Sequence, residues 1–456
     1  MFDKYVRKKL SEQTAIFITV AIWTFLASLT GLIVGFAATV FLKILDWSSF
    51  MSARVPYYFL ALPLALFIST LLVKYLAPDA EGHGTEKVIE AIHKYSGKIK
   101  LNVVPVKVLA TVITLAAGGS VGKEGPTAQI GAGIASFFAD IFRFDNFARR
   151  KIVICGISAG FAAVFGTPIA GAIFGVEVLF IGGLLYDVLF PSFVAGITAY
   201  EVSSYLGIHY FHEPVKFLPV FNEAFFLKMI IAGVFFGLIS FLLVESLEIG
   251  KKVAHKIPLW EPAKGILGGI LLCILVFIFS KQYLGLGLDS IANLLQGGQI
   301  VWYAFLVKML FTTITLNFGG SGGIVTPIFF IGSAAGVMFG NVMGLDTGTM
   351  AAIGLTGLLA GAANTPIAAS IMAIELFGPQ IAPYAAIVAV VSYLMTGHRS
   401  VYPSQILSVK KSRYVDVEVG KEIQGIQAIY NINHKNLVNV AVTVFKKIGV
   451  FRKTNN

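Results

Sequence analysis

A long apolar stretch with a glycine-rich break occurs twice in this chain, and this duplication limits the folds that the chain can adopt. Residues 106–131 and 307–332 align without a gap, and 14 of the 26 aligned positions are identical. A second matching pair follows in the same order, with GTPIAGAIFGVE at 166–177 and NTPIAASIMAIE at 364–375. The chain was therefore built by doubling one unit. In a membrane protein, such paired and interrupted apolar segments point to a transport site.

The composition places the chain in a membrane, since 56% of its residues are hydrophobic, 13% are charged and the mean hydropathy is +0.81. A spanning helix needs about 20 mostly apolar residues, and several charge-free runs reach that length: 13–42, 152–176, 309–345, 347–374 and 376–398. Many glycines and prolines lie inside these runs. Broken backbone is tolerated at membrane depth only where it is buried in protein or lines a cavity. We therefore expect an all-α polytopic membrane protein with interrupted helices.

Both ends of the chain are basic. The N-terminus reads MFDKYVRKKL, and the segment after Leu407 carries nine Lys or Arg against three acids. The positive-inside rule therefore predicts that both termini are cytoplasmic. The first apolar run is longer than the roughly 7–15 residues of a signal-peptide core, so we expect it to be retained. A nucleic-acid partner is not expected, because the basic residues are not interleaved with aromatic residues on one compact domain.

These patterns divide the chain into four parts. We expect a cytoplasmic lead at 1–13, a first transmembrane repeat at 14–212, a second at 213–407 and a short basic cytoplasmic tail at 408–456. The tail is too short for a regulatory domain of ordinary size. The chain has two cysteines, both inside apolar runs, where they are expected to be packing residues. No metal site and no cofactor are expected.

The segment GGSVGKEGP at 118–126 places one carboxylate, Glu124, in the glycine-rich break of the first repeat. Pro126 suits the first turn of a helix, where its missing N–H has no cost. A helix start presents free N–H groups and the positive end of the dipole, which favours an anion. Glu124 can therefore compete with a permeant anion, and its protonation would release the site. The alternative is a surface glutamate or a phosphate-type nest.

Four segments of the chain resemble the anion-binding segments of the CLC chloride channels and transporters. The segment at 122–126, GKEGP followed by T-x-Q-I-G, is similar to the one that carries the gating glutamate of this family. The segments at 77–92, 323–327 (GIVTP) and 400–407 (SVYPSQIL) resemble the other three, in the same order. The resemblance covers most of the chain. It implies a member of prokaryotic type, without a large cytoplasmic regulatory domain.

The resemblance also implies the arrangement of the site. It implies a homodimer in the lipid bilayer, in which each subunit has its own anion pathway and two inverted repeats meet at the anion. Glu124 would be the gate for protons and anions, and the hydroxyl of Tyr402 would contact the central anion. The remaining anion-binding positions that it implies, mostly through backbone N–H groups, are Gly82, His83, Gly84, Lys123, Gly125, Gly323, Ile324, Val325 and Thr326.

The chain departs from the family pattern in the first segment. His83 replaces the usual serine, and Thr85 and Glu86 stand where isoleucine and proline are usual. A serine-type hydroxyl contact is therefore not expected here. An imidazole can donate a hydrogen bond to an anion, so His83 either faces the anion or turns away into a cytoplasmic vestibule. Val325 replaces a phenylalanine, which matters little because the family's contact comes from backbone N–H.

A second departure concerns protons. Proton-coupled members of the family carry an internal proton-accepting glutamate at the position of Val178. The neighbouring Glu177 is one residue away, about 100° around a helix. Its repeat counterpart is Glu375, which indicates that both have a structural role in bonding backbone donors. Glu86, His83 or water would then have to carry protons on the internal side.

The sequence therefore predicts transport of chloride or a similar inorganic anion across the cell membrane, as exchange for protons gated by Glu124. Because Val178 replaces the internal glutamate, a passive chloride channel of the same family is the alternative. Fluoride-selective members of the family usually lack the tyrosine, so Tyr402 favours chloride. We do not expect an enzyme.

One enzymatic alternative was weighed, an intramembrane serine hydrolase. GGSVG at 118–122 and GGSGG at 319–323 both match G-x-S-x-G, and His398 is the nearest candidate for a base. The motif occurs at equivalent places in both repeats, as expected for a structural turn rather than for one nucleophile. Lys107 and Lys308 are also equivalent in the two repeats, and we expect them to snorkel or to face aqueous vestibules.

Overall fold

The computed structural model describes residues 2–210, 212, 223–413, 415–426 and 429–430, and for residues 2–10 it describes the backbone alone. The helices of the first half are α1 (Phe2–Ala53), α2 (Leu62–Leu76), α3 (Thr85–Tyr95), α4 (Val103–Ala116), α5 (Glu124–Ile141), α6 (Asn146–Phe165), α7 (Pro168–Glu177) and α8 (Tyr186–Tyr205). The helices of the second half are α9 (Glu223–Lys256), α10 (Glu261–Phe279), α11 (Leu288–Leu295), α12 (Ala304–Asn317), α13 (Val325–Met343), α14 (Thr347–Ala363), α15 (Pro366–Phe377) and α16 (Ala382–Met395).

The duplication in the sequence is a duplication in the structure, as predicted. The glycine-rich breaks separate α4 from α5 and α12 from α13 at matching positions. Lys123, the N-cap of α5, has φ −104° and ψ −13°, and Ile324, the N-cap of α13, has φ −105° and ψ −16°. Both α7 and α15 begin at the proline of their TPIA segment, where a residue without an N–H suits the first turn.

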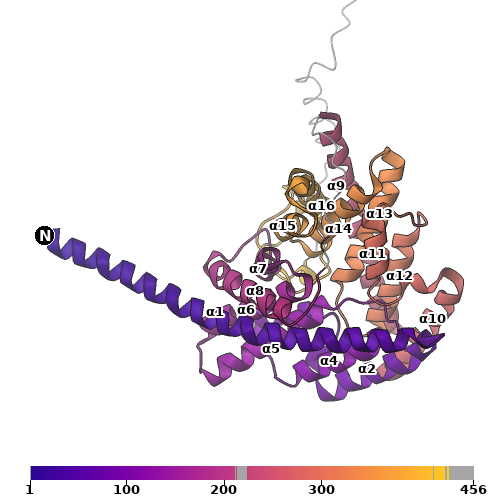
Figure 1. The fold of residues 1–456 in the computed structure, drawn as a ribbon, viewed down its shortest axis with the longest axis horizontal. Helices are drawn as coiled ribbons and strands as arrows, with labels where there is room; N and C mark the ends of the chain where they lie inside the picture. The colour runs from indigo at the N-terminus through magenta and orange to yellow at the C-terminus, as the bar shows by residue number, and fades with distance from the viewer. Residues whose placement is uncertain (1, 211, 213–222, 414, 427–428, 431–456) are drawn as a thin grey trace, which may run out of the picture.

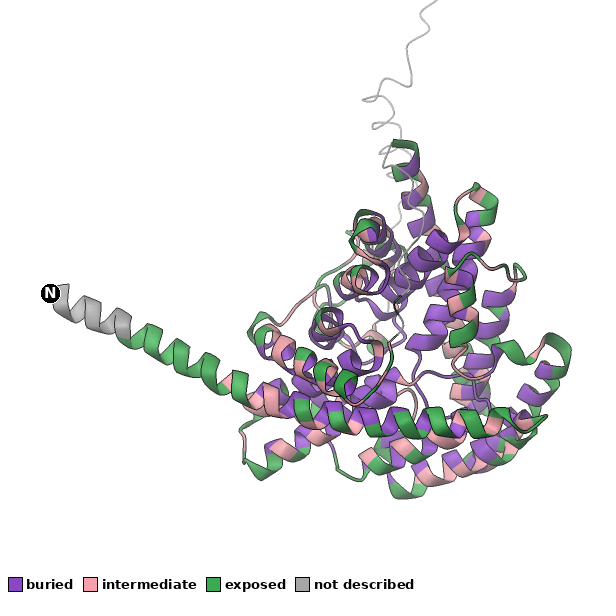
Figure 2. Ribbon diagram, viewed as in Figure 1, coloured by how far each residue is buried: buried purple, intermediate pink, exposed green. Residues whose placement is uncertain are grey.

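The helices are long and apolar enough to cross a membrane several times. In the described part of the chain, five spans meet that criterion: Ser11–Ala53, Tyr58–Leu76, Glu223–Lys256, Glu261–Phe279 and Val325–Met343. Many large apolar side chains are exposed, and Phe17 and Phe25 on α1 are 72% and 69% exposed. Figure 2 shows how exposed positions recur along α1. A soluble monomer rarely exposes large continuous apolar patches. The chain is therefore a multi-pass membrane protein.

The first helix is longer than any bilayer requires. At 1.5 Å per residue its 52 residues extend for about 78 Å, against a hydrocarbon thickness of about 30 Å. Figure 1 shows that its N-terminal part projects away from the body, while its C-terminal part runs along α5 and α4. The expected lead at 1–13 is thus continuous with the first spanning helix from Phe2 onward.

At the centre of the molecule α5 packs against α6, and α13 packs against α14. In each pair the two backbones are in direct contact. A methyl group on Gly131 of α5 would collide with the carbonyl oxygen of Gly156 on α6. In the second repeat, a methyl group on Gly332 would collide in the same way with Gly354. From Gly348 to its end α14 is buried throughout. The two glycine-rich breaks are therefore held in rigid protein.

The two repeats are joined by short reciprocal contacts. Gly122 and Gly323 form an isolated antiparallel bridge, in which each N–H donates to the carbonyl of the other at 2.6 Å. The carboxylate of Glu177 accepts the N–H groups of Ile367 and Ala368 at the start of α15, at 3.1 and 2.8 Å. The carboxylate of Glu375 binds the start of α7 in the same manner. These contacts agree with the structural role predicted for the two glutamates.

Short strands attach the C-terminal segment to the body. β1 (Phe180–Ile181) pairs in parallel with β2 (Ile406–Leu407), and β3 (Val415–Asp416) pairs antiparallel with β4 (Ile429–Tyr430). The segment that carries Tyr402 therefore returns to the end of α7. Of the predicted tail at 408–456, residues 431–456 lie outside the described part of the chain.

Candidate anion site

Glu124 is the first residue of α5, and its side chain reaches the start of α13. It is 1% exposed. One carboxylate oxygen accepts the backbone N–H of Thr326 at 3.2 Å, and the other accepts the hydroxyl of the same threonine. A negative charge is thus held at the N-terminal end of α13, where free N–H groups and the helix dipole stabilise an anion.

The loop at 82–84 closes a second side of this site. A methyl group on Gly84 would collide with the carbonyl of Gly125, and one on Gly125 would collide with the carbonyl of His83. Gly84 also has φ +83°, a conformation that favours glycine. The loop therefore packs directly on the first turn of α5. Because α3 begins at Thr85, the N-terminal ends of three helices, α3, α5 and α13, meet around Glu124.

Tyr402 lies within the same cluster. It is fully buried, and its hydroxyl faces the side chain of Thr85 without the geometry of a full hydrogen bond to any described residue. The hydroxyl is within electrostatic reach of both Glu124 and Glu86. The ring of His83 lies against the ring of Tyr402, with centroids 5.6 Å apart, and its Nδ1 is shielded from solvent without a partner in the described chain. The imidazole of His83 thus adjoins the site.

Glu86 is anchored to the segment that carries Tyr402. Its Oε1 accepts the backbone N–H of Ser404 at 3.0 Å and the hydroxyl of Ser404 at 2.5 Å. Its Oε2 is shielded and has no partner among the described residues. The four segments with anion-site resemblance therefore converge, and their contacts connect positions up to 318 residues apart.

The two repeat-equivalent lysines were predicted to snorkel or to face aqueous vestibules, and this prediction is wrong. Lys107 and Lys308 are both 0% exposed. The ammonium of Lys107 donates to the carbonyls of Ala80 and Gly82 at 3.0 and 2.5 Å. Lys308 donates to two carbonyls of residues 283 and 285 at 3.0 and 2.8 Å. Each lysine thus holds the loop that precedes a short helix, and Lys107 holds the loop of His83.

Val178 lies at the end of α7 and does not reach the cluster around Glu124 by any described contact. Its side chain is fully buried in the apolar core. Its carbonyl accepts the side-chain amide of Gln405 at 2.7 Å, and the same amide donates to the carbonyl of Ala363 at 2.9 Å. Gln405 therefore ties the ends of α7 and α14 to the segment of Tyr402.

The two serines of the G-x-S-x-G motifs are buried and bonded across the repeats. Ser120 bonds to Thr312 at 3.0 Å, and Ser321 bonds to Thr111 at 3.3 Å. The ring of His398 instead accepts the N–H of Lys411 at 3.1 Å. This symmetric pairing favours the interpretation of both motifs as structural turns.

Sequence analysis missed two contributors to the site. It included Thr326 for its backbone N–H and overlooked its hydroxyl, which contacts Glu124. It also overlooked Ser404, which anchors Glu86. A hydroxyl residue directly before the helix-starting Pro327 was the available signal for Thr326. For Ser404 the sequence carried no signal, since the contact spans 318 residues.

The fold and the site define a class of protein: a polytopic membrane protein with two inverted repeats, whose broken helices direct their N-terminal ends to one buried cluster around Glu124. The family model described as "Voltage gated chloride channel" matches residues 65–397. The chain belongs to this family, and its class of activity is anion transport.

Comparison with individual proteins gives the same result. A "Chloride/fluoride channel protein" of Pseudomonas syringae pv. tomato is 36% identical over 401 residues, which cover 86% of this chain and 88% of that protein. An "H(+)/Cl(-) exchange transporter ClcA" of Klebsiella pneumoniae is 26% identical over 393 residues, covering 77% and 80%.

Two solved structures share the fold. The structure of a CLC-type fluoride/proton antiporter superimposes with a TM-score of 0.82 at 30% identity, covering 86% of this chain and 99% of that one. A slow cyanobacterial Cl−/H+ antiporter superimposes with a TM-score of 0.71 at 22% identity, covering 82% and 94%. At that lower identity, the second structure supports the fold alone.

Proposed function

We propose that this protein exchanges a small inorganic anion for protons across a membrane, with Glu124 as the gate. The observation that carries the proposal is the carboxylate of Glu124 at the start of α13, bonded to the N–H and hydroxyl of Thr326. This is where a permeant anion would bind. The side chain and the anion carry the same charge, so they cannot occupy the position together at low cost.

Exchange follows from this competition. Protonation removes the charge of Glu124, and the neutral side chain leaves the α13 end to an anion. Loss of the proton restores the carboxylate, which displaces the anion. One group therefore responds to protons and to anions in opposite directions. The hydroxyl of Tyr402, buried without a described partner, is proposed to donate to the bound anion, together with the backbone N–H groups of the three helix ends.

Fluoride is our first candidate for the anion and chloride the second. Relatives whose names include fluoride match at 36% and 30% identity, whereas an exchange transporter named for chloride alone matches at 26%. Fluoride is small and strongly hydrated, so it needs several strong donors to replace its water. The hydroxyls of Tyr402 and Thr326, together with the N–H groups at the starts of α3, α5 and α13, supply such donors. The predicted link between Tyr402 and chloride keeps chloride as the second candidate.

The proposal is tested by transport in liposomes that contain the purified protein. Fluoride, chloride and pH electrodes would record the three ions together while an outward gradient of one anion is imposed. We expect that gradient to drive protons inward against their own gradient. Movement of anions without any movement of protons at every pH would contradict exchange.

Passive conduction is the second candidate function, because a valine stands at position 178, where proton-coupled relatives are expected to have a glutamate. In that case Glu124 gates the pathway without carrying protons through it. The same liposome recording separates the two functions, since a channel lets the anion run down its gradient and leaves pH unchanged. Serine hydrolysis is not proposed, because both motif serines are bonded to threonines of the opposite repeat.

We also propose a homodimer in the cell membrane with both termini cytoplasmic. The basic ends of the chain and the family resemblance support this arrangement. Light scattering of the detergent-solubilised protein would measure its mass and decide the oligomeric state. Labelling of single cysteines placed near each end, in intact cells and in opened cells, would decide the side on which the termini lie.

A further inference from the structure

Three buried polar atoms without a described partner lie together beside Glu124. They are Nδ1 of His83, Oε2 of Glu86 and the hydroxyl of Tyr402. The rings of His83 and Tyr402 are in contact, and Glu86 is bonded to Ser404, two residues after Tyr402. A buried polar atom without a partner costs about 1–3 kcal/mol, and native structures contain few of them. The three atoms can therefore donate or accept a proton within the cluster.

The carboxyl group of Glu86 is positioned to gain and lose a proton. One of its oxygens is fixed by two hydrogen bonds from Ser404, at 3.0 and 2.5 Å. The other oxygen has no partner in the described chain. The carboxyl group is thereby oriented, and one oxygen remains free to gain and lose a proton.

We infer that Glu86 is the second proton-accepting carboxylate of this protein and passes protons to Glu124 through the hydroxyl of Tyr402. This inference rests on the proposed anion/proton exchange and deepens it. Glu86 would thus supply the function that Val178 cannot.

The proton passes from Glu86 to Glu124 in two linked steps, and each O–H bond that breaks is matched by one that forms. A proton from water binds Oε2 of Glu86. The O–H bond of Glu86 then breaks and its proton binds the oxygen of Tyr402, while the O–H bond of Tyr402 breaks and its proton binds the Glu124 carboxylate. Glu86 returns to the carboxylate, Tyr402 is unchanged, and Glu124 becomes neutral and leaves the α13 end.

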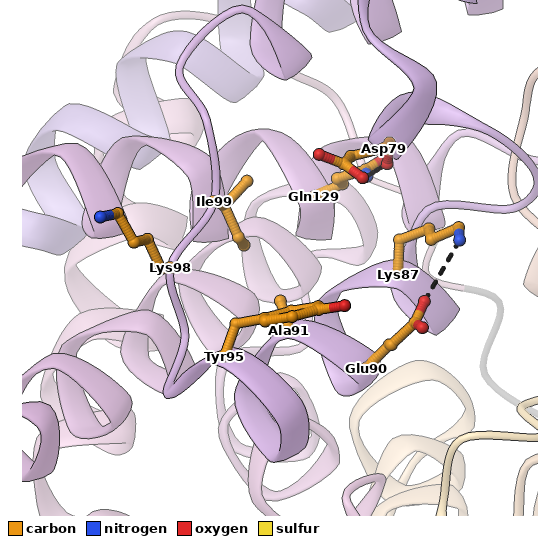
Figure 3. A pocket seen from close by; sticks show the side chains of 8 residues that line it. All are labelled: Asp79, Lys87, Glu90, Ala91, Tyr95, Lys98, Ile99 and Gln129. Atoms are coloured by element: carbon orange, nitrogen blue, oxygen red, sulfur yellow. Dashed lines mark hydrogen bonds and ion pairs between the residues drawn. The ribbon is translucent and has the colours of Figure 1, made fainter. Parts of the chain in front are cut away.

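Glu86 is itself partly exposed, and its neighbour Lys87 lines a pocket that Glu86 does not line. Figure 3 shows this pocket beside α3, which is lined by Lys87 and Glu90; the two form an ion pair at 3.2 Å. Glu86 and Glu90 are four residues apart, so they lie on the same face of α3. Both Lys87 and Glu90 act electrostatically on Glu86. Their side chains are 34% and 25% exposed, so the pocket connects the first turns of α3 to water.

His83 is a poorer carrier than Glu86, although it belongs to the same cluster. The Lys107 ammonium acts on His83 electrostatically and is held beneath its loop by two carbonyls. A proton on the imidazole would place two positive charges side by side. A proton on Glu86 instead neutralises a buried charge. The groups that surround the proposed path are therefore Lys87 and Glu90 on α3, Lys107 on α4, Glu124 on α5, Lys251 on α9, and His83 and Tyr402 in the loops.

The test compares anion flux with anion-driven proton uptake in liposomes. Glu86→Gln keeps an oxygen that accepts from Ser404 but cannot carry a proton. We expect anion flux to persist and proton uptake to fall by roughly 100-fold, the low end of what a positioned proton-transfer group contributes. Glu375→Gln is the matched control, because that carboxylate also accepts two hydrogen bonds and lies outside the site. It should keep the coupling of the unmodified protein.

Glu86→Asp retains a titratable group and separates chemistry from structure. We expect it to restore a large part of the proton uptake that Glu86→Gln loses. Unchanged coupling in Glu86→Gln would overturn the inference while leaving the exchange proposal intact. Equal loss of coupling, or of all activity, in both variants would show a purely structural role and would also overturn it. Absence of coupling in the unmodified protein would reject exchange itself, and this inference with it.

Discussion

At the scale of single residues, the site depends on a difference between two otherwise equivalent positions. Glu124 in the first repeat aligns with Val325 in the second, and Gly125 aligns with Thr326. One repeat therefore supplies the carboxylate and the other supplies the hydroxyl that binds it. A symmetric pair of glutamates would have placed two like charges in one buried site, which is strongly unfavourable.

Replacing Glu124 by glutamine should mimic the protonated gate. The amide has no charge to compete with an anion, so we expect anion flux to persist and to lose its dependence on pH. Proton movement should fall by roughly 100-fold. Simultaneous anion and pH recording from liposomes measures both. If chloride or fluoride still drives protons uphill through the Glu124→Gln protein, Glu124 is not the gate.

Removing the hydroxyl of Tyr402 should weaken anion binding. A hydrogen bond to a charged group contributes about 1.5–3 kcal/mol, so Tyr402→Phe should raise the anion dissociation constant by about 10- to 100-fold. Calorimetric titration with fluoride and with chloride measures this constant. Tyr283→Phe is the control, because Tyr283 is also buried but lies by Lys308 in the second repeat. Equal affinities of the Tyr402→Phe and unmodified proteins would remove Tyr402 from the site.

At the scale of elements, two buried lysines fix the loops that precede α3 and α11. Each ammonium binds two backbone carbonyls, and neither lysine is exposed. The two lysines make equivalent bonds in the two repeats, but only Lys107 supports the loop of His83. A comparison of the two positions therefore separates an effect on stability from an effect on anion binding. Lys107 also acts electrostatically on His83, which adjoins the candidate site.

Replacing either lysine by methionine leaves two buried carbonyls without their donor. We expect both variants to lose stability, by about 1–3 kcal/mol for each unpaired carbonyl. Anion affinity should fall in Lys107→Met and stay unchanged in Lys308→Met. Thermal unfolding in detergent and calorimetric titration measure the two effects. A similar loss of affinity in both variants would mean that the loop of His83 has no special part in binding.

Sequence analysis predicted the elements and their meeting point well, because glycine breaks, prolines and repeated apolar runs are local features. It could not predict that Lys107 and Lys308 are buried. An apolar flank is equally compatible with snorkelling and with binding to internal carbonyls, and only the folded loops supply those carbonyls. The contacts of Glu86 with Ser404 and of Glu124 with Thr326 join distant segments through side-chain rotamers, which no sequence pattern records.

At the scale of the whole molecule, the two repeats are held together by exchanged carboxylates. Glu177 binds the first N–H groups of α15, and Glu375 binds those of α7. A negative charge at a helix N-terminus is favourable. Of the donors, Ala170 and Ala368 are buried, whereas Ile169 and Ile367 are exposed. The pair therefore locks the relative position of α7 and α15 without contacting the anion site.

Glu177→Ala should therefore destabilise the fold. Two N–H groups of α15 lose a charged acceptor, so we expect the free energy of unfolding to fall by about 1–3 kcal/mol while anion transport persists. Glu248→Ala is the control, since Glu248 forms an exposed ion pair on α9 that contributes about 0–1 kcal/mol. Thermal unfolding in detergent compares the two variants. Equal midpoints for Glu177→Ala and Glu248→Ala would show that the exchanged carboxylates do not hold the repeats together.

The bridge between Gly122 and Gly323 has a consequence for the ancestry of the protein. Each glycine supplies one donor and one acceptor to a segment that runs in the opposite direction. Because the two repeats of this fold are inverted, a forebear with a single repeat would have made this bridge with a second copy inserted in the opposite orientation in the same membrane. Such a forebear had to enter the bilayer in both orientations. Fusion of the two genes then fixed the orientation of each repeat. The first repeat could acquire the carboxylate of Glu124, and the second could acquire the hydroxyl of Thr326.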